Sequence, residues 1–271
     1  MREEENKMNE KQNLLTTVAQ NWEHFLALTL LILAAFLITF FAEKAARKKE
    51  LREYGRTEAI FSARKIAIIG VFSAISFVLM FFEFPLFFAP SFYKFDFSDI
   101  PALIGGFACG PMVAVMIEFV KVALNILIQG TTSGFVGEIA NFVVGAAFVV
   151  PATIIYRFKK NRKVALISCL VGTVCIAIVG ATLNAFFLLP AYAVMFGSGV
   201  DTFIQMGTAI NPAITNLFTF CALCVAPFNL LKGVVDSLIT FLVYKQLSPI
   251  LKADRLSASR KVNKSEAEAE A

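Results

Sequence analysis

The chain has 271 residues, of which 58% are hydrophobic, and its mean hydropathy is +0.71. These values exclude an ordinary soluble domain, because several apolar segments reach the roughly 20 residues needed to cross a bilayer. The net charge of +5 does not indicate nucleic-acid binding, since the basic residues concentrate beside the apolar segments. Composition therefore predicts an all-α integral membrane protein with several spans.

The N-terminal part of the chain predicts one helix that stands apart from the others. Residues 1–22 are polar and mixed in charge. The apolar run that follows predicts a membrane helix over residues 23–43, since it is too long for a signal-peptide core and lacks a convincing cleavage site. Residues 44–65 are rich in Lys and Arg and predict a basic cytoplasmic linker.

Six further apolar segments predict a membrane domain over residues 66–247. They cover 66–82, 99–109, 112–128, 134–156, 164–189 and 216–244. The second segment is short, and Gly110-Pro111 after it marks a turn. The fifth is expected to end at Pro190, which cannot continue a regular helix. Residues 248–271 are polar and predict a disordered tail.

The distribution of charge predicts the orientation of these helices. If the linker lies inside, alternation through six crossings also places the basic segment 157–163 and the C-terminus inside, as the positive-inside rule requires. The outer segments carry Asp96, Asp99 and Asp201 against Lys94. The sequence therefore predicts a multi-pass cell-membrane protein with six core helices, one extra N-terminal helix and a cytoplasmic C-terminus.

Polar side chains at helical spacing indicate a shared polar interior. They are Glu118, Lys121 and Asn125 in the third core segment, Glu138 and Asn141 in the fourth, Asn184 in the fifth, and Asn229, Lys232 and Asp236 in the sixth. Pro227 can kink the last helix beside this stripe, as in many transport sites. The alternative is that Lys232 pairs with Asp236 along its own helix, and for Glu118 with Lys121 a pair within the helix is favoured.

Two loops facing the predicted outer side have two interpretations each. The Gly/Thr-rich segment 130–137 is either a helix N-terminus able to hold an anion or hydroxyl groups, or an ordinary tight turn. It lacks the lysine of a nucleotide-binding P-loop. The aromatic residues between positions 84 and 97 form either an interfacial belt or a lid over a flat ligand.

Small residues recur along the first core helix, at Ala63, Ala67, Gly70 and Ala74. This pattern lets another helix approach closely, within the bundle or from another subunit. The five cysteines include one C-x-x-C pair, but the chain has a single histidine, so no metal site is predicted. No catalytic motif is present, so neither an enzyme nor a resident cofactor is expected.

Several short runs together resemble the substrate-binding (S) component of energy-coupling-factor (ECF) vitamin transporters, and most closely its riboflavin-specific members. They are Phe84-Pro85, Lys94–Phe107, Gly110-Pro111, Gly137–Phe142, Asn184–Pro190 and Pro227–Gly233. The resemblance covers about residues 63–247. It implies a six-helix S-component core that captures riboflavin, or FMN, from outside. The implied partners are a transmembrane coupling subunit and two cytoplasmic ATPase subunits. The extra helix lies outside the resemblance.

The resemblance also implies roles for individual residues. In that family an Asn on the fifth helix and an Asn-x-x-Lys on the sixth contact the flavin, which correspond here to Asn184, Asn229 and Lys232. Glu138 and Asn141 are weaker candidates for the ribityl hydroxyls. The loop Phe84–Tyr93 would act as a gate, and the small residues Ala63, Ala67, Gly70 and Ala74 would face the coupling subunit. The alternatives are an S component for another vitamin, or a proton-coupled secondary transporter that uses Glu138, Glu118 or Asp236.

Overall fold

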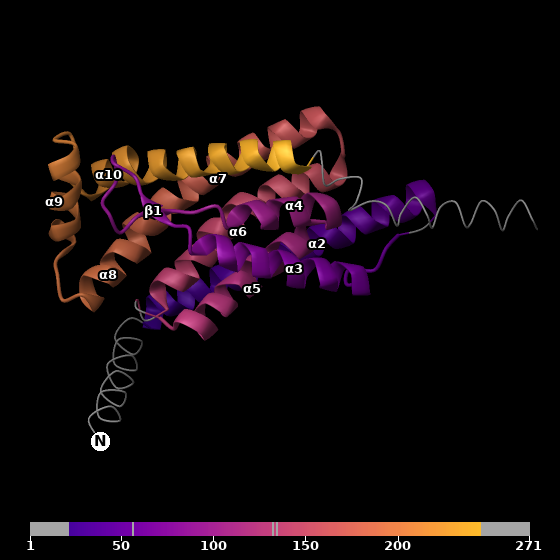
Figure 1. Cartoon of the computed structure of the whole chain (residues 1–271), viewed down its shortest axis with the longest axis horizontal. Helices are drawn as coiled ribbons and strands as arrows, with labels where there is room; N and C mark the ends of the chain where they lie inside the picture. The colour runs from indigo at the N-terminus through magenta and orange to yellow at the C-terminus, as the bar shows by residue number, and fades with distance from the viewer. Residues whose placement is uncertain (1–21, 56, 132, 134, 245–271) are drawn as a thin grey trace, which may run out of the picture.

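The computed structural model describes residues 22–55, 57–131, 133 and 135–244 (Figure 1). The predicted polar segment before Trp22 and the predicted tail 248–271 lie outside these residues. The described part is a bundle of long helices with one short antiparallel ribbon, in which β1 (Phe84–Pro85) pairs with β2 (Lys94–Phe95).

Helices account for nearly all of the remaining described structure, as the apolar composition predicts. They are α2 (Trp22–Tyr54), α3 (Ala63–Met80), α4 (Asp99–Cys109), α5 (Pro111–Gln129), α6 (Val136–Phe158), α7 (Arg162–Leu183), the π-helical turn η1 (Asn184–Leu188), α8 (Leu189–Met195), α9 (Val200–Ile210), α10 (Leu217–Phe220) and the π-helical turn η2 (Cys221–Val225), followed by a helix over residues 226–244. Within the described ranges, six helical stretches are long and apolar enough to cross a membrane: Thr29–Glu53, Ala63–Met80, Pro111–Gln129, Val136–Phe158, Arg162–Val194 and Leu217–Tyr244.

Helix α4 differs from the prediction of seven spans, because it is too short to be one. Its 11 residues extend about 16 Å, whereas the hydrocarbon core of a bilayer is about 30 Å thick. Every residue of α4 is buried, and a Cβ on Gly106 would lie 2.3 Å from Thr153 Cγ2 on α6. Glycine therefore lets α4 pack against its neighbours inside the bundle, where protein rather than lipid surrounds it.

The fifth predicted segment continues past Pro190, where the sequence predicted an end. Helix α7 runs through η1 into α8, and Pro190 occupies the first turn of α8. The π-helical turn widens the hydrogen-bonding pattern just before the proline, and the Leu189 N–H bonds to the Asn184 carbonyl. This local change accommodates the missing N–H of Pro190 without a break in the helix.

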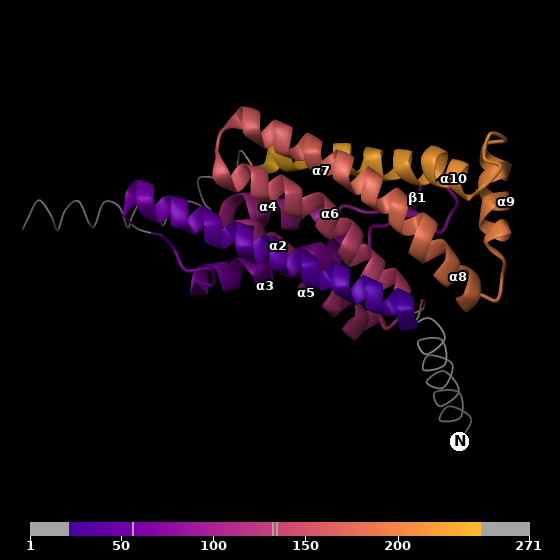
Figure 2. The same ribbon diagram turned by 180° about the vertical axis from the view of Figure 1, so that it is seen from behind.

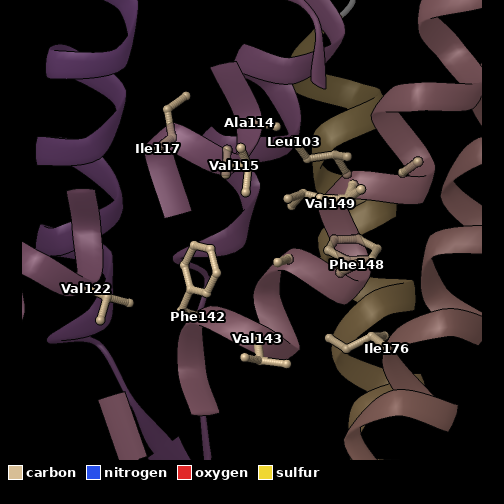
Figure 3. Close-up of a cluster of buried hydrophobic side chains, with 14 of the residues drawn as sticks. Leu103, Ala114, Val115, Ile117, Val122, Phe142, Val143, Phe148, Val149 and Ile176 are labelled. Atoms are coloured by element: carbon tan, nitrogen blue, oxygen red, sulfur yellow. The ribbon is translucent and has the colours of Figure 1, made fainter. Parts of the chain in front are cut away.

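The long helices enclose a hydrophobic core built mainly from α4, α5, α6 and α7 (Figure 3). Phe142, Phe148 and Ile176 lie at most 2% exposed at its centre. A second buried cluster joins α8, α9, α10 and the β1–β2 ribbon. These elements gather at one end of the bundle in Figure 1, which we name the outer end. Helix α9 at this end was not predicted from the sequence.

Helix α2 is the extra N-terminal helix, and it lies along α5 and α6 (Figure 2). Phe36 packs on Phe119 of α5 and on Phe142 of α6, with ring centroids 5.6 and 6.0 Å apart. The helix continues to Tyr54 and thus includes half of the predicted linker 44–65. Residues of high helix propensity fill this extension, and carboxylates on it bind the core.

Four residues form an inner ion cluster that fixes α2 to the core: the buried Glu43 on α2, Lys65 on α3 and Arg157 on α6, and the partly exposed Glu50 on α2. Arg157 lies 3.2 Å from Glu43 and also pairs with Glu50, while Lys65 lies 3.9 Å from Glu43. Glu43 also packs against the α4–α5 turn, since a Cβ on Gly110 would lie 2.3 Å from Glu43 Oε2. The segments predicted to face inside therefore meet at one end of the bundle.

Candidate substrate-binding site

A cavity of about 960 Å³ opens at the outer end of the bundle. Its walls come from the loop before α4, the facing ends of α5 and α6, helices α8 and α9, and the helix over 226–244. All five predicted substrate-contacting residues line it: Glu138, Asn141, Asn184, Asn229 and Lys232. The volume falls within the range of cavities that enclose drug-sized ligands.

Asn184 and Asn229 converge on Gly180 of α7. The amide group of Asn184 donates to the Gly180 carbonyl at 2.8 Å, and a Cβ on Gly180 would lie 2.6 Å from Asn229 Nδ2. Asn229 Nδ2 donates to the Val225 carbonyl at 2.9 Å. Because both amides are fixed by carbonyls four residues earlier in their helices, their carbonyl oxygens have defined positions at the cavity wall.

Both asparagines adjoin a π-helical turn. Asn184 is the first residue of η1, and the carbonyl that holds Asn229 belongs to the last residue of η2. The sequence predicted a kink at Pro227, but the described irregularity precedes the proline and lies in η2. Single π-helical turns inside α-helices often occur at functional sites, because they redirect side chains by one position.

Lys232 lines the cavity and pairs with another element rather than with its own helix. Its ammonium group is 3.1 Å from Asp96 Oδ1 and 3.3 Å from Asp99 Oδ2, and it donates to the Asp96 carbonyl at 3.3 Å. The alternative that Lys232 pairs with Asp236 is therefore wrong in this structure. The cavity-lining ammonium has three protein acceptors, so a ligand that binds it must exchange one of them.

Asp99 carries the ion network farther into the bundle. Its Oδ1 atom binds Lys121, and Lys121 in turn lies 2.7 Å from Glu118 and donates to Ser98 at 2.9 Å. The expected pair of Glu118 with Lys121 within their helix is thus present. Both side chains are fully buried, and this pair lies next to Asp99, which lines the cavity.

The Gly/Thr-rich loop before α6 is closed by its own hydroxyl groups. Thr131 Oγ1 accepts from the Ser133 and Phe135 backbone N–H groups at 3.3 and 2.9 Å. Ser133 Oγ accepts from the Gly137 N–H at 2.9 Å and donates to Glu138 at 2.7 Å. Because these backbone donors already have acceptors, the structure favours the tight turn over the anion site.

The first outer loop forms part of the cavity wall. Tyr93 donates its hydroxyl proton to Asn184 Oδ1 at 2.6 Å, and its ring lies 4.5 Å from Phe92 and 5.7 Å from Phe228. Burial raises the pKa of the Tyr93 phenol well above its usual value, so the hydroxyl keeps its proton and acts as the donor. Phe87, by contrast, is 92% exposed. The loop therefore combines a partly buried cavity wall at Tyr93 with an exposed tip at Phe87.

Sequence reasoning did not assign roles to three residues of the site, Asp96, Asp99 and Gly180, and it placed Tyr93 only in the gate loop. Tyr93, Asp96 and Asp99 lie far in the chain from Asn184 and Lys232, so no local spacing could reveal these contacts. Gly180 stands four residues before Asn184, and that spacing places both on one face of α7. This spacing is the signal in the sequence that could have placed Gly180 beside the site.

Gly180→Ala is expected to weaken ligand binding about tenfold, because the added methyl group would overlap Asn229 Nδ2 and displace its amide. Equilibrium titration of the purified variant measures this effect. Gly70→Ala is the matched control, since a Cβ there meets no atom within 4 Å. Unchanged affinity in Gly180→Ala would show that the close approach to Asn229 does not position a ligand contact.

The geometry defines a class of protein: a helical membrane protein with a partly polar cavity that opens toward one end of the bundle. Residues 64–244 match the family model described as "ECF transporter, substrate-specific component". The chain belongs to this family of transporter components, whose members are not enzymes. As such a component, it works with an ECF energising module. The family assignment favours a binding component over a self-sufficient secondary transporter.

Several characterised proteins are similar to this chain over most of their own length. The riboflavin transporter FmnP of Bacillus subtilis is 32% identical over 193 residues, which are 71% of this chain and 96% of that protein. The riboflavin transporter RibU of Staphylococcus aureus is 34% identical, over 70% of this chain and 93% of its own. A solved S component of a bacterial ECF transporter superposes with a TM-score of 0.54 at 34% identity, covering 69% of this chain and 97% of that one. Helix α2 precedes the residues matched by the family model.

Proposed function

We propose that the protein is the riboflavin-binding subunit of an ECF transporter, which captures the vitamin at the outer face of the cell membrane. The observation that carries this proposal is the convergence of Asn184, Asn229 and Lys232 on one cavity. The names of the relatives support riboflavin as the substrate class. The basic inner end supports a cytoplasmic C-terminus.

The chemistry of the cavity suits a flavin. The isoalloxazine ring has wide apolar faces and an imide edge with two carbonyl acceptors and one N–H donor. An asparagine amide both donates and accepts, whereas a lysine only donates. Asn229 Oδ1 can accept from the imide N–H while Lys232 donates to a ring carbonyl. The rings of Tyr93 and Phe92 offer apolar surface for the ring faces.

The polar opposite wall suits the ribityl chain. Glu138 and Asn141 line this side of the cavity, and Ser133 binds Glu138 there. Carboxylate and amide oxygens accept from sugar hydroxyls. Riboflavin is favoured over FMN as the substrate, because the loop donors that would bind a phosphate already have acceptors.

The function is tested by titrating the purified full chain in detergent with riboflavin and following the quenching of flavin fluorescence. Stoichiometric quenching, or a preparation that is already yellow, would support the proposal. Competition by FMN and by unlabelled vitamins determines which compound binds best. A folded preparation that binds neither riboflavin nor FMN would move the substrate to another vitamin.

We further propose that α3 meets the coupling subunit of the module, which itself works with two cytoplasmic ATPases. All four small residues of its stripe are exposed: Ala63, Ala67, Gly70 and Ala74. No atom lies within 4 Å of a Cβ placed on Gly70. This shallow face lets a partner helix approach closely.

Ala67→Trp is expected to abolish copurification with the coupling subunit while riboflavin affinity stays within about twofold, because the indole would hold the partner helix away. Coexpression and affinity capture measure the assembly. Ile75→Trp is the matched control, since Ile75 is also exposed but lies on another side of α3. Normal assembly of Ala67→Trp would place the interface elsewhere.

A further inference from the structure

Asp236 is a fully buried carboxyl group that has no ion-pair partner among the residues that the structure describes. It is 0% exposed, and within the described ranges neither carboxyl oxygen has a hydrogen-bond partner. Its spacing from Lys232 would allow an ion pair within the helix, yet the ammonium group of Lys232 binds Asp96 and Asp99 instead. An ionised carboxylate in this position would be left unpaired in a low-dielectric interior, at high energetic cost.

The surrounding charges explain why Asp236 is the group left over. Those that act on it are Lys232 on its own helix, Asp96 and Asp99 at the start of α4, and Lys121 on α5. Lys121 also pairs with Glu118. The two lysines therefore already face three carboxyl groups in direct ion pairs, so a fourth ionised carboxylate would add uncompensated negative charge.

We propose that Asp236 is a proton-binding site beneath the substrate cavity, and that its bound proton directs Lys232 toward the cavity. A neutral Asp236 does not compete for the ammonium group, which stays with Asp96 and Asp99 at the cavity wall. Loss of the proton creates a carboxylate one helical turn from Lys232, and this carboxylate draws the ammonium away from the ligand. Asp236 is thus a positioning residue for Lys232. The second half of the proposal rests on the proposed function.

The proton itself is tested by infrared spectroscopy on the full chain in detergent, without ligand. A protonated carboxylic acid has a C=O stretch separate from the bands of carboxylates. At neutral pH the wild type is expected to show such a band, and Asp236→Asn is expected to remove one component of it. Asp201→Asn is the matched control, because Asp201 is exposed on α9 and its loss should leave the band unchanged. A band that persists unchanged in Asp236→Asn would overturn the proposal.

The link to binding is tested by riboflavin titrations at neutral and alkaline pH. Asn resembles a protonated Asp in shape and charge, so Asp236→Asn should bind as well as wild type at neutral pH. At alkaline pH wild type is expected to bind about tenfold more weakly than the variant, since only wild type gains a competing carboxylate. Comparison at equal pH removes effects of flavin ionisation. Parallel pH profiles for both proteins would overturn the link.

Two outcomes keep this inference separate from the proposed function. If Asp236→Asn does not fold, the wild-type band must disappear with rising pH in step with riboflavin affinity, and a constant band would contradict the proposal. If wild type binds no riboflavin at any pH, the proposed function and the link both fail, whereas the infrared band still decides whether Asp236 holds a proton.

Discussion

Lys232→Ala weakens riboflavin binding by at least about tenfold, which corresponds to about 1.4 kcal/mol of binding free energy. We expect this result because the substitution removes the ammonium donor that lines the cavity. It also leaves Asp96 and Asp99 with one fewer counter-charge, and Asp99 retains Lys121. Asn229→Ala is expected to have a loss of similar size, since it removes the neighbouring amide.

Fluorescence titration of each variant in detergent measures the effect on affinity. Leu231→Ala is the control, because Leu231 lies beside Lys232 in the chain but is 38% exposed on the outer surface of the helix. It should bind as wild type does. Wild-type affinity in either Lys232→Ala or Asn229→Ala would contradict the proposed flavin contacts, and a loss in Leu231→Ala as well would point to general damage of the helix.

Glu43→Ala is expected to destabilise the chain by about 3–5 kcal/mol, because it removes a buried carboxylate from Lys65 and leaves Arg157 with Glu50 in place of two partners. Glu43 is 1% exposed and faces two buried cations, Lys65 and Arg157. A large fall in the midpoint of thermal unfolding in detergent would report this loss. The effect would show that α2 is part of the folded unit although it precedes the matched family region.

Two comparisons separate the ion cluster from other contributions of α2. Glu53→Ala is the matched control on the same helix, since Glu53 is half exposed and pairs with Lys49 at 3.8 Å, and such surface pairs contribute about 0–1 kcal/mol. Arg157→Met added to Glu43→Ala should cost less than Arg157→Met alone, because one of the two carboxylate partners of Arg157 is already absent. If the stability losses of the two substitutions simply add, Glu43 and Arg157 do not interact energetically.

Local patterns in the sequence predict the helices and the polar residues of the cavity. Apolar length identifies the long spans, and helical spacing places Asn229 and Lys232 on one face. The same rules fail where distant segments decide. Spacing along one helix indicated Asp236 as a possible partner of Lys232. The observed partners are Asp96 and Asp99, and Asp96 lies 136 positions before Lys232 in the chain.

The length of helices is also set partly by contacts that no local window contains. Helix α2 continues beyond its apolar run because Glu43 and Glu50 reach Arg157, which lies 114 and 107 positions away. Pro190 does not end its helix, since the π-helical turn η1 precedes it. The short α4 is apolar like a span but has only 11 residues, and its complete burial shows that the protein itself surrounds it.

The short, wholly buried α4 has a consequence for biosynthesis. A helix of about 16 Å cannot be released into lipid as an independent span, because its ends would remain at hydrocarbon depth. We therefore expect α4 to enter the membrane together with α5, as the two arms of a hairpin joined at Gly110-Pro111. The carboxyl groups that hold Lys232 thus reach their places only after the ribosome has completed α5, and the final helix must arrive later still to complete the cavity.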